Sequence, residues 1–208
     1  MTVEPGEART HPCLRRRGQV LEEAIFDAVL HQLRTVGYGR LTMEGVAACA
    51  HTGKAALYRR WGSKEELVVA ALQHALPAFA GPPDHGNVRD DLLVLLRAMA
   101  AHVSSPAGCA MQAVLGEADR ERAFVELVHE RVLQPRKRLL SAVLRRAAER
   151  GEIDPAAPLH LVAEVGPAMI LQRFNTAGPP IPDDYVVSVV DDVVMPLLRP
   201  EPVSGPRR

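Results

Sequence analysis

The sequence predicts an all-α fold, and three observations lead to that prediction. Apolar residues recur at intervals of three and four over most of the chain, which is the period of an amphipathic helix. No run of alternating apolar and polar residues with hairpin-type turns occurs, so the pattern of a β-sheet is missing. Gly and Pro separate the periodic segments, as expected where helices end. We therefore expect about nine helices, with a three-helix unit at the N-terminal end and a helical bundle after it.

The first two helices follow directly from this period. Seven apolar residues of Gln19–Val36 lie on one helical stripe, and Gly37 follows as a residue that readily adopts the left-handed conformation of a helix end. A second, short helix is expected over Thr42–Ala50, because threonine is a good N-cap. The two helices are thus separated by a short connection.

A tight turn and two further helices complete the N-terminal part. The residues His51-Thr52-Gly53 form the turn, and a short helix is expected over Lys54–Trp61. Ser63 stands three residues before Glu66, which is the spacing of a capping box. The helix that this box opens carries apolar residues as far as Leu76.

The stretch 80–86 (AGPPDHG) is the one convincing internal break. Beyond it, Pro135 is expected to kink or split the longest periodic segment, because proline cannot donate the helical hydrogen bond. The helices expected there cover 88–104, 106–117, 119–150, 158–175 and 183–198. The domains are then 18–77 and 87–199, with a disordered basic arm at 1–17 and a disordered tail at 200–208.

Composition excludes several classes of protein. The formal net charge of 0 argues against a uniformly basic nucleic-acid binder. Three widely spaced cysteines without a CxxC pair, and histidines without HExxH spacing, give no reason to expect a metal or another cofactor. No apolar run reaches about 18 residues, so we expect a cytoplasmic protein without a membrane span.

The two short helices around His51 suggest a DNA-reading unit. Such a pair cannot bury its own apolar faces and needs a third helix, here the first one, which makes a helix-turn-helix domain. Leu57 and Trp61 are four residues apart and are expected to face the core. The opposite face of the same helix then presents small and basic residues, namely Lys54, Ala55, Tyr58 and Arg59, to a DNA groove.

Residues from about Gln19 to Leu76 resemble the DNA-binding domain of the TetR/AcrR family. The specific part of the match is Lys54-Ala55-x-Leu57-Tyr58-Arg59-Arg60-Trp61-x-Ser63-Lys64-Glu65-Glu66-Leu67. The resemblance implies that Thr42 and Met43 flank the DNA backbone, that Gly53, Lys54, Ala55 and Ala56 face the major groove, and that Tyr58, Arg60 and Lys64 contact phosphates.

The sequence departs from the family pattern at three positions of this unit. His51 stands in the turn where Gly is usual, Thr52 replaces a buried Val, and Ala56 replaces a Thr. Histidine tolerates a left-handed conformation less well than glycine, so we expect a slightly strained turn that still binds DNA. Upstream, Arg15, Arg16 and Arg17 either enter the minor groove as an arm or belong to a solvated tail.

The segment 136–198 resembles one type of C-terminal ligand domain in the same family. This resemblance implies a homodimer formed through the last two helices, about 158–175 and 183–198, which would place two recognition helices on one palindromic operator. It also implies a pocket for a small, largely apolar ligand. The candidate pocket residues are Arg97, Met99, His102, Gln112, His129, Met169 and Arg173.

The function predicted from these features is a ligand-responsive, DNA-binding transcriptional regulator that binds a double-stranded operator. Repression is the family default, and activation stays open. An enzyme finds no support, because GxSxG, GxxxxGK[ST], GxGxxG and HExxH are all missing. The remaining alternative is a helical adaptor that does not bind DNA. The basic run 136–138 is interpreted as a solvated helix face.

Overall fold

The computed structural model describes residues 18–77, 79, 81–116 and 122–199, and these residues contain helices and no strand. The expected arm with Arg15, Arg16 and Arg17 and the expected tail at 200–208 lie outside the described residues. Where helical elements follow one another without a break they form one rod, so the described part of the chain contains nine continuous helices. The elements are α1 (Gln19–Thr35), α2 (Met43–Cys49), α3 (Lys54–Tyr58), α4 (Lys64–Ala75), α5 (Val88–Val103), α6 (Pro106–Gly116), α7 (Arg122–Val128), η2 (His129–Leu133), α8 (Gln134–Glu149), α9 (Leu159–Ala177), α10 (Asp183–Ser188), η3 (Val189–Val194) and α11 (Met195–Leu198).

The ends of the first helices follow the chemistry of their capping residues. The hydroxyl of Thr42 accepts a hydrogen bond from the backbone N–H of Gly45, so α2 begins where it was expected. The hydroxyl of Ser63 accepts from the N–H of Glu66, while the Glu66 carboxylate accepts from the N–H of Gly62 at 2.8 Å. The capping box is thus present, with its return bond displaced by one residue. The helix α3 is shorter than expected, ending at Tyr58.

The turn between α2 and α3 has the strain that the sequence predicts. His51 has a φ of 53°, in the left-handed region that non-glycine residues rarely adopt. Gly37, at the end of α1, has a φ of 78° and takes the same region without a Cβ penalty.

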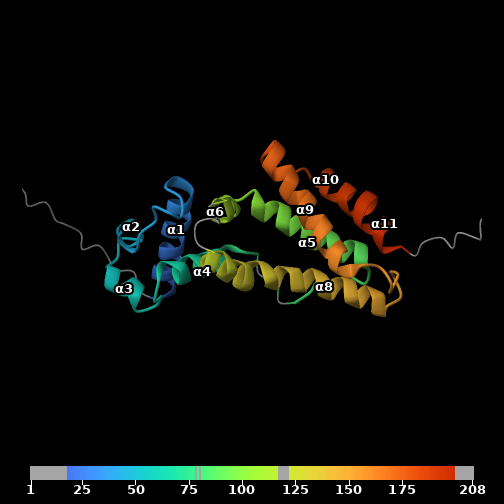
Figure 1. Ribbon diagram of the computed structural model, residues 1–208, viewed down its shortest axis with the longest axis horizontal. Coiled ribbons are helices and arrows are strands. Elements are labelled where there is room, and N and C mark those ends of the chain that lie inside the picture. The colour runs from blue at the N-terminus through green and yellow to red at the C-terminus, as the bar shows by residue number, and fades with distance from the viewer. Residues whose placement is uncertain (1–17, 78, 80, 117–121, 200–208) are drawn as a thin grey trace, which may run out of the picture.

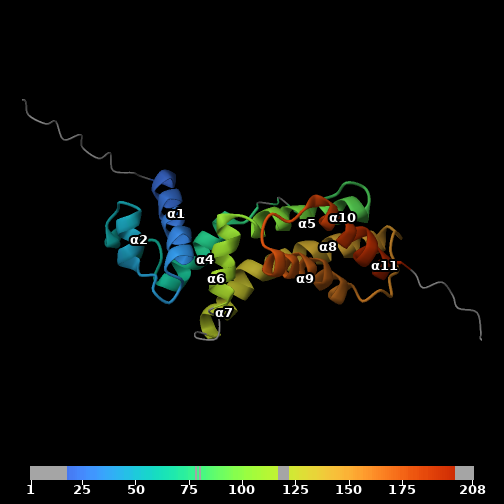
Figure 2. The same cartoon turned by 90° about the horizontal axis from the view of Figure 1, so that it is seen from above.

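The elongated molecule has a head, α1–α4, at one end and a body, α5 with α8–α11, at the other (Figure 1). In both views α6 lies between them, and it packs against α1 (Figure 2). The helices α5 and α6 meet at a bend of 78°. Among the described residues, no single helix has the length and apolar content to span a membrane, although α5 and α6 together pass that test.

The buried residues form two clusters whose boundary differs from the expected domain boundary at residue 77. One cluster comprises the head and also includes Met111 and Val114 of α6 and Phe124 and Val128 of α7. The other cluster occupies α5 and α8–α11. A unit of about 60 residues buries a smaller fraction of its surface than a larger domain and is marginally stable, and here the head extends its core onto α6 and α7.

Pro135 was expected to kink or split the segment 119–150, but the described residues 122–149 stay helical throughout, with a π-helical turn just before the proline. Proline lacks the N–H that would bond to the carbonyl of Arg131, four residues earlier. That carbonyl instead accepts a hydrogen bond from the side-chain amide of Gln73 on α4, at 2.9 Å. The π-helical turn η2 lies at this point, immediately before α8, and the bond connects it to the head.

Candidate functional site

The outward face of α3 carries the small and basic residues that the sequence placed there. Gly53, Lys54, Ala55, Tyr58, Arg59 and Arg60 are all exposed. Leu57 is fully buried, and the Trp61 ring lies 5.5 Å from the Phe26 ring of α1. The inward prediction for Leu57 and Trp61 is therefore confirmed, and α3 is held on the core by one face only.

The side chains of two candidate DNA-contacting residues are turned away from this face. Met43 is 5% exposed and belongs to the core of the head, and Ala56 is 9% exposed. The side chain of Met43 therefore cannot reach a phosphate, and only its backbone, in the first turn of α2, remains available. Likewise the methyl group of Ala56 is buried, whereas Ala55 is exposed. Thr42 is exposed beside them.

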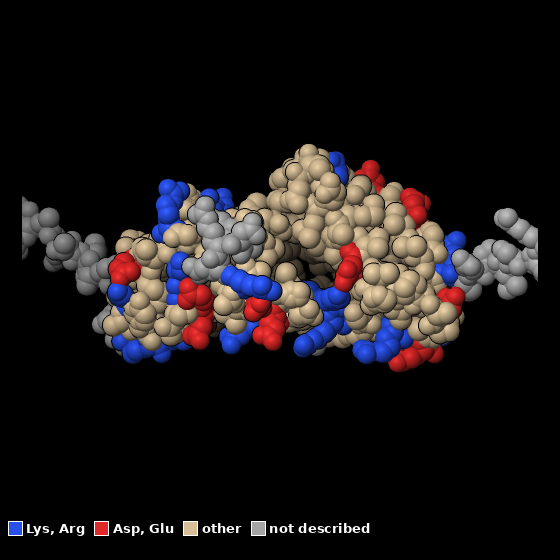
Figure 3. Space-filling model, in the orientation of Figure 1, with Lys and Arg blue, Asp and Glu red and all other residues tan. Residues whose placement is uncertain are grey.

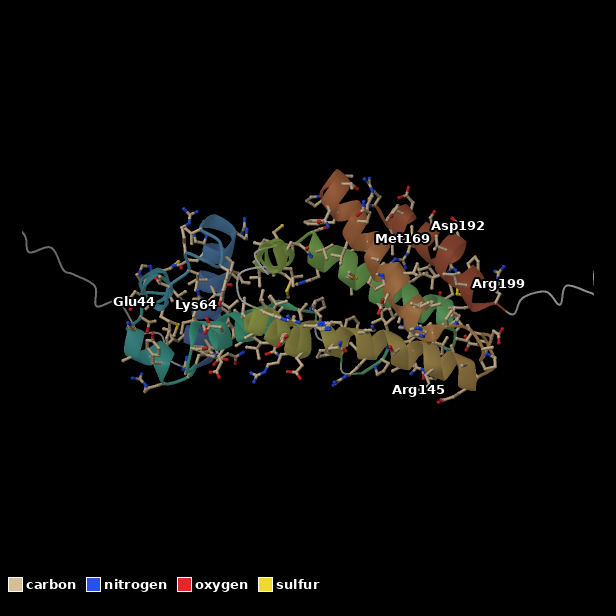
Figure 4. All side chains as sticks on the ribbon, in the orientation of Figure 1. Glu44, Lys64, Arg145, Met169, Asp192 and Arg199 are labelled. Carbon is tan, nitrogen blue, oxygen red and sulfur yellow. The ribbon has the colours of Figure 1, made fainter. Side chains whose placement is uncertain are left out.

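Lys54 is not free on this face. Its ammonium forms an ion pair with the Glu44 carboxylate of α2 and lies 5.4 Å from the centre of the Tyr58 ring. The hydrogen bond between the two side chains raises the pKa of Lys54 and lowers the pKa of Glu44. Arg59 and Arg60, in contrast, have no carboxylate within ion-pair distance among the described residues. Figure 4 labels Glu44 at the far end of the head.

Lys64 lies at the start of α4 and is half-buried against Tyr38. Its ammonium donates a hydrogen bond to the Tyr38 carbonyl at 3.3 Å and lies 4.0 Å from the centre of the Tyr38 ring. The Tyr38 hydroxyl donates to Glu65 at 2.8 Å, and its ring stacks on Phe124 of α7 at 4.1 Å. Lys64 therefore supports the packing of the head on α7, and its remaining N–H groups are available to a phosphate.

A cavity of about 400 Å³ lies between the head and the body. Its wall is mainly apolar and comes from the chain just after α4 and from α5, α6, η2, α8 and α9. Of the seven candidate pocket residues, Met99, His102 and Gln112 line it. Figure 3 shows a hollow in the middle of this face, with acidic and basic side chains at its rim.

The other four candidates lie elsewhere because they have partners of their own. Arg97 forms a two-point contact with Asp183 at 2.6 and 2.8 Å, which connects α5 to α10. The His129 ring is 2.8 Å from the Gln134 amide, and the Arg173 guanidinium lies 5.7 Å from the centre of the Tyr185 ring. Met169, labelled on α9 in Figure 4, packs against the core of the body.

The cavity also contains charged residues that the sequence interpretation missed. Arg136, Lys137 and Glu164 line it, so the run 136–138 is not simply a solvated face. Lys137 and Glu164 form an ion pair with each other. Arg136 shares its helical stripe with Leu133 and Leu140, three residues before it and four after it. This spacing could have indicated from the sequence that Arg136 faces the interior.

Comparisons with known proteins agree with this arrangement. Residues 25–71 match the family described as bacterial regulatory proteins, tetR family, and residues 82–193 match the tetracyclin repressor-like C-terminal domain. An uncharacterised HTH-type transcriptional regulator of Mycobacterium tuberculosis is 37% identical over 177 residues, which cover 85% of this chain and 87% of the relative. A protein of Mycobacteroides abscessus, named a DNA-binding transcriptional repressor, is 30% identical over 88% of this chain and 97% of its own length.

Solved structures share the fold over nearly their whole length. A TetR family transcription regulator is 27% identical with a TM-score of 0.61, covering 85% of this chain and 97% of its own. GusR of Salmonella enterica, 16% identical, has a TM-score of 0.73 over 88% of this chain and 98% of its own, and shows the same fold. With both parts matched and an exposed helix-turn-helix in the head, this chain belongs to the TetR family of DNA-binding transcriptional regulators, which is not a family of enzymes.

Proposed function

We propose that this protein is a cytoplasmic homodimeric repressor that binds a palindromic operator and releases it when a small, largely apolar molecule enters the cavity. The observation that carries the proposal is the position of the cavity, which adjoins both buried clusters. Met111 of its wall belongs to the core of the head, and Leu96 and Leu140 belong to the core of the body. The M. abscessus relative, named a repressor, supports repression.

A path for the response runs through α4 and α6. Leu76 and Pro77, just after α4, line the cavity, and so do Met111 and Gln112 of α6. Both helices pack on α1, which packs on α2, and α2 in turn packs on the recognition helix α3. A ligand that separates these helices from the body changes the orientation of the head, and linkage requires the operator to weaken ligand binding by the same factor.

The proposed dimer interface is formed by α9 with α10–α11, which lie side by side at the surface of the body (Figures 1 and 2). Two large apolar side chains stand out from it, Leu161 at 52% exposure and Leu197 at 47%. Pairing of these helices with a second copy would bury both and form a four-helix interface. Two heads at fixed spacing then read two half-sites, whereas one short helix covers too few bases for selectivity.

Duplex DNA from upstream of the protein's own gene provides the test. In fluorescence anisotropy at moderate salt, a dimer verified by sedimentation is expected to bind this duplex about a thousandfold more tightly than unrelated DNA. A preference of less than tenfold, or a monomer at the concentrations where binding occurs, would contradict the proposal and favour a helical adaptor.

Removal of the Glu44 carboxylate is expected to strengthen DNA binding. In Glu44→Gln, Lys54 is released to the DNA and one negative charge near the phosphates disappears, so affinity should rise about threefold or more on every duplex. The slope of log affinity against log salt should steepen by up to about one. Glu126→Gln removes an exposed carboxylate paired with Arg122 on α7 and serves as the control, with no expected change. Unchanged affinity in Glu44→Gln would mean that the ion pair persists on DNA.

The role of Lys54 in reading a base is best tested in the Glu44→Gln background, since removal of Lys54 alone leaves an unpaired carboxylate facing the DNA. The double variant Glu44→Gln/Lys54→Ala is expected to lose about tenfold discrimination at one base position of the operator and to keep the others. Glu44→Gln/Tyr58→Ala should instead weaken binding equally on all sequences, as a phosphate contact requires. An equal loss for the Lys54 variant on all operator variants would assign Lys54 to phosphate.

A further inference from the structure

One positive charge in the cavity wall has no negative partner. The Arg136 guanidinium donates a hydrogen bond to the carbonyl of Pro77 and lies 5.5 Å from the centre of the Phe79 ring. No Asp or Glu among the described residues lies within ion-pair distance of it. Burial lowers the pKa of Arg136, but a guanidinium stays protonated at any pH at which the protein is folded.

The other polar groups of the wall leave this charge uncompensated. The Lys137 ammonium and the Glu164 carboxylate neutralise each other in their ion pair. His102 lines the same cavity, and its Nε2 atom is buried without a hydrogen-bond partner. Burial, and next the charge of Arg136, lower the pKa of His102. At neutral pH the ring is therefore uncharged, and Nε2 can donate an N–H to a ligand oxygen in one of its two tautomers.

An uncharged apolar ligand would fit this cavity poorly in energetic terms. When it displaced water from the wall, it would desolvate the guanidinium, and the buried His102 nitrogen would still have no partner. A carboxylate can pair with both groups. It accepts two parallel hydrogen bonds from a guanidinium and balances its charge, and it can accept the N–H of His102. The surrounding wall, with Leu95, Met99, Leu139 and Leu171, then accommodates an apolar body.

We infer that the ligand of this cavity is an amphipathic organic acid, whose carboxylate binds Arg136 and His102 and whose aliphatic or aromatic body fills the apolar part. This inference rests on the proposed function, in which the cavity is the effector site. The acid also has a direct effect on the path to the head. By engaging Arg136 it competes with the carbonyl of Pro77, and loss of that bond frees the chain that directly follows α4.

Three probes of matched shape and different charge test the inference on the full-length protein without DNA. Isothermal titration calorimetry is carried out with decanoate, decanamide and decylammonium. Decanoate is expected to bind at least about tenfold more tightly than the amide, and the ammonium more weakly than both. Arg136→Gln should abolish the preference for decanoate over decanamide, while Arg136→Lys should keep part of it. Arg138→Gln, which removes an exposed cation two residues along the same helix, should leave the preference unchanged.

The inference is overturned if decanamide binds as tightly as decanoate, if none of the three probes binds, or if Arg136→Gln retains the preference. Circular dichroism shows whether Arg136→Gln is folded. If it is not, the preference of Arg136→Lys for decanoate over decanamide decides the test. Operator release, measured separately, distinguishes the two proposals. Arg136-dependent binding of decanoate without release of the operator contradicts only the proposed function. Release of the operator by an uncharged molecule, with decanoate not bound, contradicts only the assignment of an acid.

Discussion

Gly108→Ala is expected to lower the melting temperature by roughly 6–12 °C, the equivalent of about 3 kcal/mol in a protein of this size. A Cβ at Gly108 would lie 2.2 Å from the carbonyl oxygen of His102 and 2.5 Å from the Cα of Val103. Both are backbone atoms of α5, so no side-chain rotation relieves the contact. The bend between α5 and α6 has to open, and α6 then moves relative to α1 and to the cavity.

Gly116→Ala provides the matched control on the same helix, since a Cβ there meets nothing within 4 Å. Its melting temperature should stay within about 2 °C of the unmodified protein, measured at one protein concentration because dimerisation contributes to stability. Equal melting temperatures for the two alanine variants would show that the close approach of α6 to α5 is not needed.

Asp91→Asn is expected to reduce the free energy of unfolding by about 3 kcal/mol, as loss of one partner of a buried ion pair does. Asp91 is fully buried in the first turn of α5. Its carboxylate accepts hydrogen bonds from the N–H of His85 at 2.7 Å and from Arg146 of α8 at 3.1 Å, and Arg150 lies 3.8 Å away. An amide keeps the shape but removes the one fully buried carboxylate among the described residues that pair with Arg146 and Arg150. Asp90→Asn, half-exposed on the same turn, is the control, with an expected change below about 0.5 kcal/mol.

The same carboxylate gives the protein a dependence on acidic pH. Burial alone would raise the pKa of Asp91, but the hydrogen bonds from His85 and Arg146 outweigh burial and lower the pKa below its ordinary value of 3.8. The folded state therefore favours the ionised form, and this stabilisation is present above about pH 4 and lost as the pH falls through the lowered pKa. In urea unfolding, Asp91→Asn should lose less stability than the unmodified protein over that range. A parallel decline in both proteins would assign the acid sensitivity to other groups.

The recognition unit could be predicted from the sequence because its signals are local. The caps at Thr42 and Ser63, the left-handed Gly37 and the spacing of Leu57 and Trp61 each depend on residues within one or two turns. His51 stands where Gly is usual in the family pattern, which was enough to predict a strained turn, and its φ of 53° agrees.

The pocket could be predicted only in part, for a physical reason. Residue type suggested that Arg97 and Arg173 were available to a ligand, but each has a partner 12 or more residues away, Asp183 and Tyr185 respectively. Arg136 was missed for the opposite reason. A basic run is interpreted as a solvated face until the position of its helix in the fold is known. In the head, burial of Met43 and Ala56 likewise depends on how the helices pack together.

The sequence by itself determined the all-α fold, the capped starts of α2 and α4, the family and the face of α3 that turns outward. These properties depend on periodicity, capping and a specific run of residues, all of which act over a few positions. Only the tertiary structure decided that the head completes its core on α6 and α7, that Glu44 holds Lys54, and that Arg136 lies unpaired in a cavity. Those features depend on which distant groups meet, and the free energies of burial and charge pairing are defined only once the helices are packed together.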